Sequence, residues 1–323
     1  MSEGSRWSTA ALVGLLVVDV ALVAAAFAGV RFDASSRTDD SPSRFAGTTS
    51  GAPSDTVSET TPTDVEVTRR PATLLAVVDA RVAWRATVGG CADGGAGVEL
   101  TSDGGAQWVA VGTDPGLSTI SGLRPETAAA GFVVGASTDC TVGAKGTVDG
   151  GSTWTAVAGP EGVWSLDPAH QRNVLAPGGA SIKPCGDNVV VDVADVPGRA
   201  STAAALCADG EVVRTEDQGE SWSSAGSPPG SLALALTTLG GGDAGVVVAG
   251  TSDDCAGIAV SAFDTASADT SSEAALTPLS CLGKDRPSEG DLDVSARGSV
   301  VWLLAGDETW VADGDLETWD VTD

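Results

Sequence analysis

Residues 147–154 read TVDGGSTW, and this stretch decides the fold because it recurs. Two other stretches, 101-TSDGGAQW-108 and 215-TEDQGESW-222, fit the same pattern T-x-D-x-G-x-x-W without gaps. Three matches at four fixed positions indicate an internal repeat. A single copy would suggest a metal loop or a catalytic turn, whereas a motif that recurs along the chain indicates a structural corner.

The residue types of the repeat suit a turn that needs no ligand. Asp is short enough to accept hydrogen bonds from the backbone amides of its own turn. Gly supplies a positive φ, Thr supports the turn, and Trp covers the corner. We therefore interpret the repeated positions as structural, with no catalytic or metal-binding role: Thr101, Asp103, Gly105, Trp108, Thr147, Asp149, Gly151, Trp154, Thr215, Asp217, Gly219 and Trp222.

The sequence around the repeats predicts an all-β fold. Short runs of Val, Ala and Leu alternate with Gly-rich turns, as in 130-AGFVVGAS-137 and 231-SLALALTT-238, and this is typical of many short strands. A fourth copy without Trp ends at Asp264, and a decayed fifth copy covers 300–319. The aspartates from Asp103 to Asp264 are spaced by 46, 68 and 47 residues. Two spacings match one four-stranded propeller blade, about 40–50 residues, and the longer one indicates extra strands without a box.

The three stretches resemble the Asp-box, or BNR, repeats of sialidases, sortilin-type receptors, xyloglucanases and a photosystem II assembly factor. The resemblance implies that residues 72–323 form a β-propeller, with each box between the third and fourth strands of a blade. This length makes about five to seven four-stranded blades; we expect six, with seven as the alternative. Trp84 and Trp302 lie in equivalent strands and are expected in the core. Whether the closing blade combines both ends of the domain stays open.

An apolar run at residues 9–30 predicts one N-terminal transmembrane helix, since about 20 apolar residues span a bilayer. A cleaved signal peptide is the alternative, although its apolar core is usually shorter, about 7–15 residues. Residues 1–8 would be a short cytoplasmic N-terminus. Residues 31–71, rich in Ser, Thr, Pro and Asp, predict a disordered linker. Together these segments predict a single-pass cell-membrane protein whose C-terminal domain is extracellular.

The chain contains six cysteines, all within the predicted propeller: Cys91, Cys140, Cys185, Cys207, Cys255 and Cys281. An even number without a CxxC motif in an exported chain favours disulfides. Proximity in the sequence suggests Cys185–Cys207 and Cys255–Cys281, which leaves Cys91–Cys140 to bridge neighbouring blades. Zinc is the alternative, but the ligand spacing does not fit, and the sequence predicts no metal site.

Composition excludes several functions. The net charge of −27 and pI of about 4.1 argue against nucleic-acid binding, which needs a basic patch. The sialidases that the repeats resemble use a Tyr nucleophile, and this chain has no Tyr. A Ser-His-Asp triad would have to use His170, but the sequence contains no G-x-S-x-G nucleophile elbow. It also contains no P-loop and no dinucleotide-binding glycine motif, so no cofactor is expected. We predict a non-enzyme.

The remaining prediction is a membrane-anchored, extracellular protein-interaction or assembly module. The alternative is a propeller that binds carbohydrate, or hydrolyses it with paired carboxylates. That alternative requires exposed aromatic side chains, and the candidates are Trp164, Trp310 and Trp319. Tryptophan side chains more often pack in the core or at a corner of the fold. The sequence names neither the partner nor the oligomeric state.

Overall fold

The computed structural model describes residues 70–157, 163–238, 244–264, 277–283, 285–314 and 316–322, all of which belong to one unit of contacts. This part of the chain forms 23 strands. It includes no helix with the length and hydrophobicity needed to span a bilayer. The predicted anchor at 9–30 lies outside the described residues, so it stays a prediction.

The first half of the described chain forms three antiparallel sheets, which are blades 1 to 3. Blade 1 comprises β1 (Thr73–Val77), β2 (Ala83–Thr87), β3 (Gly97–Thr101) and β4 (Val109–Ala110). Blade 2 comprises β5 (Thr119–Pro125), β6 (Gly131–Ala136), β7 (Val142–Thr147) and β8 (Thr155–Val157). Blade 3 comprises β9 (Ser165–Leu166), β10 (Val174–Leu175) and β11 (Ser181–Ile182).

The second half forms three four-stranded antiparallel sheets, which are blades 4 to 6. Blade 4 comprises β12 (Val190–Val196), β13 (Arg199–Cys207), β14 (Val212–Thr215) and β15 (Ser223–Gly226). Blade 5 comprises β16 (Ser231–Thr238), β17 (Ala244–Ser252), β18 (Cys255–Asp264) and β19 (Thr277–Leu282). Blade 6 comprises β20 (Leu292–Arg297), β21 (Val300–Ala305), β22 (Glu308–Asp313) and β23 (Asp320–Thr322).

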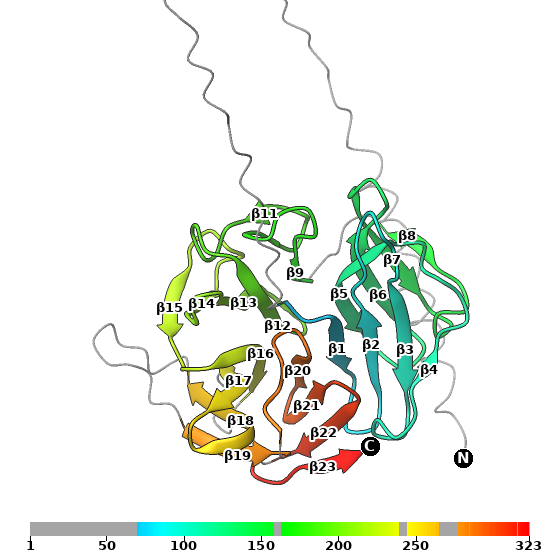
Figure 1. The fold of residues 1–323 in the computed structure, drawn as a ribbon. Helices are drawn as coiled ribbons and strands as arrows, with labels where there is room; N and C mark the ends of the chain where they lie inside the picture. The colour runs from blue at the N-terminus through cyan, green and yellow to red at the C-terminus, as the bar shows by residue number, and fades with distance from the viewer. Residues whose placement is uncertain are drawn as a thin grey trace, which may run out of the picture. The chain divides into compact units, whose positions relative to one another are not determined.

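The six sheets form a closed ring through the strands nearest its centre. β1 contacts β5 and β20, β16 contacts β12 and β20, and β9 contacts β5 and β12. Figure 1 shows these strands around a common centre, with the later strands of each blade farther out. The predicted all-β fold and the expected number of six blades are therefore confirmed.

Blade 3 has three strands in the described part of the chain, and its contacts show which positions of the blade they occupy. Trp164, directly before β9, donates its indole N–H to Ala200 O at 3.0 Å, beside the turn between β12 and β13. Trp302, on the second strand of blade 6, donates in the same way to Asp79 O at 3.0 Å, in the turn between β1 and β2. β9 therefore occupies the place of a second strand. The described part of blade 3 has no innermost strand. This shortened blade accounts for the 68-residue spacing and is the set of extra strands without a box that the spacing indicates.

Closure of the ring does not use a shared sheet. Blade 1 is built only from the start of the domain and blade 6 only from its end. Side chains join them: Asp293 accepts from Leu75 N at 2.5 Å, and Thr322 Oγ1 donates to Gly104 O at 3.2 Å. Trp302 lies in the same seam and, like Trp84, is completely buried, as expected for core residues. The seam is thus a packed interface between two complete blades.

Candidate functional site

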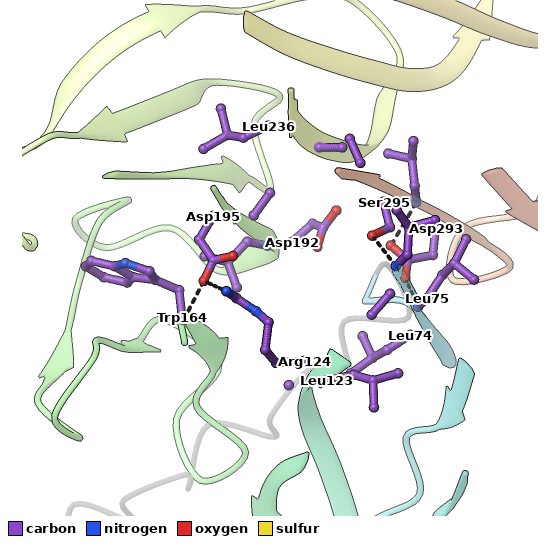
Figure 2. A pocket seen from close by; sticks show the side chains of 18 of the residues that line it. Leu74, Leu75, Leu123, Arg124, Trp164, Asp192, Asp195, Leu236, Asp293 and Ser295 are labelled. Atoms are coloured by element: carbon purple, nitrogen blue, oxygen red, sulfur yellow. Dashed lines mark hydrogen bonds and ion pairs between the residues drawn. The ribbon is translucent and has the colours of Figure 1, made fainter. Parts of the chain in front are cut away.

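The centre of the ring contains a small cavity of about 100 Å³. All six blades contribute to its lining, through β1, β5, β9, β12, β16 and β20. Its polar side chains include Arg124 from β5, Asp192 and Asp195 from β12, and Asp293 from β20 (Figure 2). None of these four residues belongs to the repeated motif or to the other candidate residues predicted from the sequence.

Arg124 and Asp195 form an ion pair that joins blade 2 to blade 4, beside the described part of blade 3. The guanidinium of Arg124 in blade 2 donates to the carboxylate of Asp195 in blade 4, and both side chains are largely buried. The same Asp195 oxygen accepts from the backbone N–H of Trp164 at 3.0 Å. Burial raises the pKa of Asp195, while the charge of Arg124 acts to lower it. Side chains thus connect blades 2, 3 and 4 at a place where the described residues form no inner strand.

Asp192 and Asp293 each join neighbouring inner strands. Asp192 accepts from Leu234 N of blade 5 at 2.8 Å and from Val193 N at 2.7 Å. Asp293 accepts from Leu75 N of blade 1 and from Val294 N at 2.9 Å. Each carboxylate therefore accepts one hydrogen bond from the next blade and one from its own strand.

Burial also changes the acidity of this pair. Desolvation raises the pKa of Asp192 from 3.8 to about 6, against the lowering effect of the two backbone N–H groups. Desolvation likewise raises the pKa of Asp293 well above 3.8, and the negative charge of Asp192 raises it further. At acidic to neutral pH the centre of the ring therefore retains protons that exposed carboxylates release.

A glycosidase pairs a carboxylic acid of raised pKa with an ionised carboxylate, and the geometry here does not provide a substrate site for such a pair. Small-molecule pockets usually measure about 300–1,000 Å³, and this cavity holds about 100 Å³. Every oxygen of Asp192 and Asp293 already accepts a backbone N–H. The pair acts on the fold by fastening blades together.

The three repeated turns have the same hydrogen bonds. The Thr Oγ1 donates to the Asp Oδ1 at 2.8, 2.8 and 2.7 Å in chain order, and accepts from the Gly N–H at 3.1, 3.0 and 2.9 Å. The same Asp Oδ1 accepts from the backbone N–H four residues later, at 3.0, 2.9 and 3.0 Å. These bonds lower the pKa of Asp103, Asp149 and Asp217. The aspartates thus act on their own turns.

The Trp of each repeated turn packs against a Trp of the preceding blade. The edge-to-face pairs are Trp154 with Trp84, Trp108 with Trp302 and Trp222 with Trp164, with ring centroids 6.2, 6.3 and 5.6 Å apart. Such pairs contribute about 0.5–1.5 kcal/mol beyond area burial. A turn that is local in sequence therefore also joins two blades.

The repeated glycines are required by both conformation and space. Gly105, Gly151 and Gly219 have φ values of 96°, 79° and 87°. A Cβ atom on Gly151 would lie 2.5 Å from Val111 of blade 1, and one on Gly219 would lie 2.7 Å from Ile182 of blade 3. Each turn therefore sits directly on the outer part of the preceding blade.

Arg70 fixes the start of the described chain to the far side of the ring. Its guanidinium donates to the carbonyl oxygens of Val190 at 2.9 Å, Asp167 at 3.2 Å and Gln171 at 2.6 Å. Burial lowers its pKa to about 10, although Asp167 acts to raise it. Arg70 lies within the predicted linker 31–71 and nevertheless contacts blades 3 and 4.

Three disulfides lie at one face of the ring, where the inner strands begin and the second strands end; we call it the start face. They are Cys91–Cys140, Cys185–Cys207 and Cys255–Cys281, the pairs suggested by sequence order. The predicted presence of disulfides is confirmed. The first joins blades 1 and 2, the second joins the connection after blade 3 to blade 4, and the third lies within blade 5.

The remaining candidate residues have structural surroundings. His170 is 67% exposed in a loop before β10, with Nδ1 3.2 Å from Asp167 Oδ2. Trp164 and Trp310 are buried, and partly buried Trp319 donates its indole N–H to Leu316 O at 2.9 Å. No group of three or more potential metal ligands occurs among the described residues.

Two larger hollows open on the start face. One, of about 450 Å³, lies on blade 5 beside the Cys255–Cys281 disulfide. The other, of about 620 Å³, lies between blades 5 and 6 and is lined by the connection after β19 together with Trp310. Both volumes fall in the range of ligand pockets, which the central cavity does not reach.

Comparison with known proteins finds similarity to solved structures only. No family model and no curated protein matches the sequence. A solved structure of YCF48 bound to D1 peptide is 17% identical, with 78% of this chain and 67% of that chain covered and a TM-score of 0.27. The SapL1 lectin in complex with alpha methyl fucoside is 13% identical, with 78% and 95% covered and a TM-score of 0.48. A GH74 enzyme of Niastella koreensis is 13% identical, with 76% and 47% covered and a TM-score of 0.31.

Proposed function

We propose that this chain is a membrane-anchored, extracellular β-propeller that serves as a protein-interaction or assembly module. The observation that carries the proposal is the pair of hollows on the start face of a ring whose blades are fastened together. Asp192, Asp293, the Trp pairs and the Cys91–Cys140 disulfide all join neighbouring blades. Loops on such a rigid frame lose little conformational entropy on binding.

Membrane anchorage and extracellular location are part of the same proposal. The apolar run at residues 9–30 is long enough to span a bilayer. Three disulfides within the propeller suit an oxidising compartment. We also propose that the repeated turns are Asp boxes, because three separate segments share one set of hydrogen bonds. The proposal assigns no catalytic residue, cofactor or metal.

A second candidate function is carbohydrate binding, favoured by one observation. Trp310 lines the hollow between blades 5 and 6 together with acidic side chains, and sugar sites combine an aromatic surface with carboxylates. Against it, little of the Trp310 ring is exposed. We therefore place protein interaction first.

Crosslinking in intact cells, followed by affinity capture and mass spectrometry, tests the proposed function. The full chain should capture a defined protein, and a control chain limited to residues 1–69 should not. Fractionation and external protease treatment of the same cells should place the propeller outside the membrane. Recovery of no specific partner, combined with binding on a glycan array, would replace the first candidate with the second.

A further inference from the structure

The hollow between blades 5 and 6 has an apolar floor. Ile258 on β18 is 2% exposed and Trp310 on β22 is 5% exposed. Val321 on β23 lies directly opposite Trp310 in the antiparallel ladder, so both side chains are on one face of blade 6. Val321 is 55% exposed, which is unusual among the large apolar residues of the described chain. Val321 therefore provides the exposed apolar surface of the floor, against which an apolar group of a ligand can pack.

The rim of this hollow is negatively charged. Asp285 and Asp291 come from the connection between β19 and β20, and Glu308 begins β22. All three side chains are exposed. Within the described residues, no side chain or backbone N–H pairs with any of these three carboxylates. Their charges are thus available to a ligand.

The one described cationic side chain in the lining is engaged elsewhere. Arg286 donates to Ser252 O at 3.1 Å and lies 3.8 Å from the carboxylate of Asp253, both in the turn between β17 and β18. The charge of Arg286 therefore compensates that of Asp253 in blade 5. Among the described residues, no cationic side chain pairs with the three rim carboxylates.

The walls of the hollow are held in place. Gly306 N donates to Asp291 O at 3.0 Å, which ties the connection to the turn between β21 and β22. On the blade 5 side, Ile258 pairs with Leu282 next to the Cys255–Cys281 disulfide. A preformed site binds with a smaller entropic cost.

We propose that this acidic hollow, defined by Ile258, Trp310, Val321, Asp285, Asp291 and Glu308, binds an arginine or lysine side chain of a basic peptide segment in a partner protein. The inference rests on the proposed function and names the class of partner. The apolar stem of such a side chain packs on the floor, and its cation meets the carboxylates at the rim. Guanidinium forms paired hydrogen bonds with carboxylate. The net charge of −27 also attracts a basic segment at long range, an advantage that a neutral glycan does not gain.

NMR titration of the full-length, ¹⁵N-labelled protein in detergent micelles tests the site directly. The readout is the indole N–H resonance of Trp310, assigned with Trp310→Phe. The probe is N-acetyl-arginine amide, and the uncharged isostere N-acetyl-citrulline amide is its control. We expect a saturable shift with the arginine probe and none with citrulline.

A triple variant, Asp285→Asn, Asp291→Asn and Glu308→Gln, removes the rim charges. We expect it to weaken binding of the arginine probe by about tenfold or more. The matched control, Asp93→Asn, Asp187→Asn and Glu220→Gln, removes three exposed charges away from the hollow and should bind like wild type. Dispersed, wild-type-like spectra establish that both variants are folded.

Three outcomes would overturn the site. They are no shift with arginine, an equal shift with citrulline, and an equal loss of binding in both triple variants. A shift with N-acetylglucosamine alone would assign the hollow to carbohydrate. Crosslinking separates the two proposals: a partner captured equally by wild type and the rim variant leaves the proposed function standing and removes this site. Binding of the arginine probe without any captured partner would support this site and remove the proposed function.

Discussion

The aspartates of the three repeated turns differ in one neighbour, and that neighbour sets their acidity. Four residues after the Asp stand Gln107, Thr153 and Ser221. The hydroxyls of Thr153 and Ser221 donate to the second Asp oxygen at 2.7 and 2.6 Å. The pKa of Asp217 is lowered to about 2, and the Ser221 hydroxyl is the largest cause.

Replacing that hydroxyl should make Asp217 less acidic. In Ser221→Ala we expect the pKa of Asp217 to rise from about 2 towards 3.8, because its strongest donor is lost while the backbone N–H remains. Carboxyl ¹³C NMR titration measures this value, and Ser223→Ala on β15 serves as the control. An unchanged pKa in Ser221→Ala would show that the hydroxyl is not the cause. Since ionised Asp217 stabilises the fold above pH 3.8 and this contribution is lost as pH falls through about 2, the variant should also unfold earlier on acidification.

Gln218 occupies a position that glycine fills in the other two turns. Its φ is 63°, and the equivalent Gly104 and Gly150 have φ values of 82° and 67°. A left-handed conformation costs a non-glycine residue about 1–2 kcal/mol, partly offset by the extra freedom of glycine in the unfolded chain. We expect Gln218→Gly to raise the free energy of unfolding by about 0.5–1 kcal/mol in denaturant titration. Gln107→Gly, at a position without positive φ, should not be stabilising; stabilisation by both changes would refute the strain argument.

At the scale of elements, the disulfides differ in accessibility. Neither Cys91 nor Cys140 is buried, whereas each of the other two bonds includes one buried partner, Cys207 or Cys255. We expect mild reductant to open Cys91–Cys140 first, as measured by timed alkylation and mass spectrometry. Simultaneous reduction of all three bonds in the folded state would contradict this order.

Loss of the same bond should also cost the most stability. Its loop spans 49 residues, against 22 and 26 for the others. The chain-entropy relation gives about 4 kcal/mol for the longest loop and about 3.5 kcal/mol for the shorter ones. Denaturant unfolding of the Cys91→Ala/Cys140→Ala and Cys255→Ala/Cys281→Ala variants measures the difference.

Local elements were predictable, whereas for the irregular blade only the presence of extra strands without a box could be predicted. The repeated turns contain their own hydrogen-bond donors and acceptors within eight residues, so a sequence pattern is enough to find them. The blade between the second and third turns has no such pattern. Its strands are two residues long, and its place in the ring depends on Trp164 and Ala200 of the next blade. Contacts of this kind have no period along the sequence.

For the whole molecule, the central carboxylates make stability depend on pH. Asp192 ionises at about pH 3.8 when unfolded and at about pH 6 when folded, because burial disfavours its charge. The folded state therefore holds a proton that the unfolded state releases. The contribution of Asp192 to the free energy of unfolding is complete below pH 3.8. It falls by about 3 kcal/mol as the pH rises from 3.8 to about 6.

Asp192→Asn should remove the part of this dependence that Asp192 contributes. The Asn side-chain oxygen can still accept from Leu234 N, and no charge is left to disfavour. The free energy of unfolding of wild type should fall between pH 4 and pH 7, and that of the variant should fall by about 3 kcal/mol less. Asp93→Asn, on the surface, should keep the wild-type slope. Equal slopes in wild type and Asp192→Asn would mean that another group titrates.

The central residues escaped the sequence analysis because ring closure brings them together. Arg124 and Asp195 are 71 residues apart, and Asp293 is 218 residues from its partner Leu75. A weaker signal was present: 190-VVDV-193 and 292-LDV-294 place an Asp inside an apolar strand. A charged residue there needs a buried partner, and the sequence does not identify which one.

The hydrogen bonds of Arg70 have a mechanical consequence. Force applied through the chain ahead of Arg70 reaches the carbonyl groups of blades 3 and 4 before it reaches β1 in blade 1. The load is thereby spread across the diameter of the ring and does not peel one blade from its seam. In single-molecule pulling from the N-terminal side, Arg70→Ala should rupture at lower force, and Arg81→Ala, in the turn after β1, should rupture like wild type. Arg70 would then protect the seam of blade 1 from force that acts on the chain ahead of it.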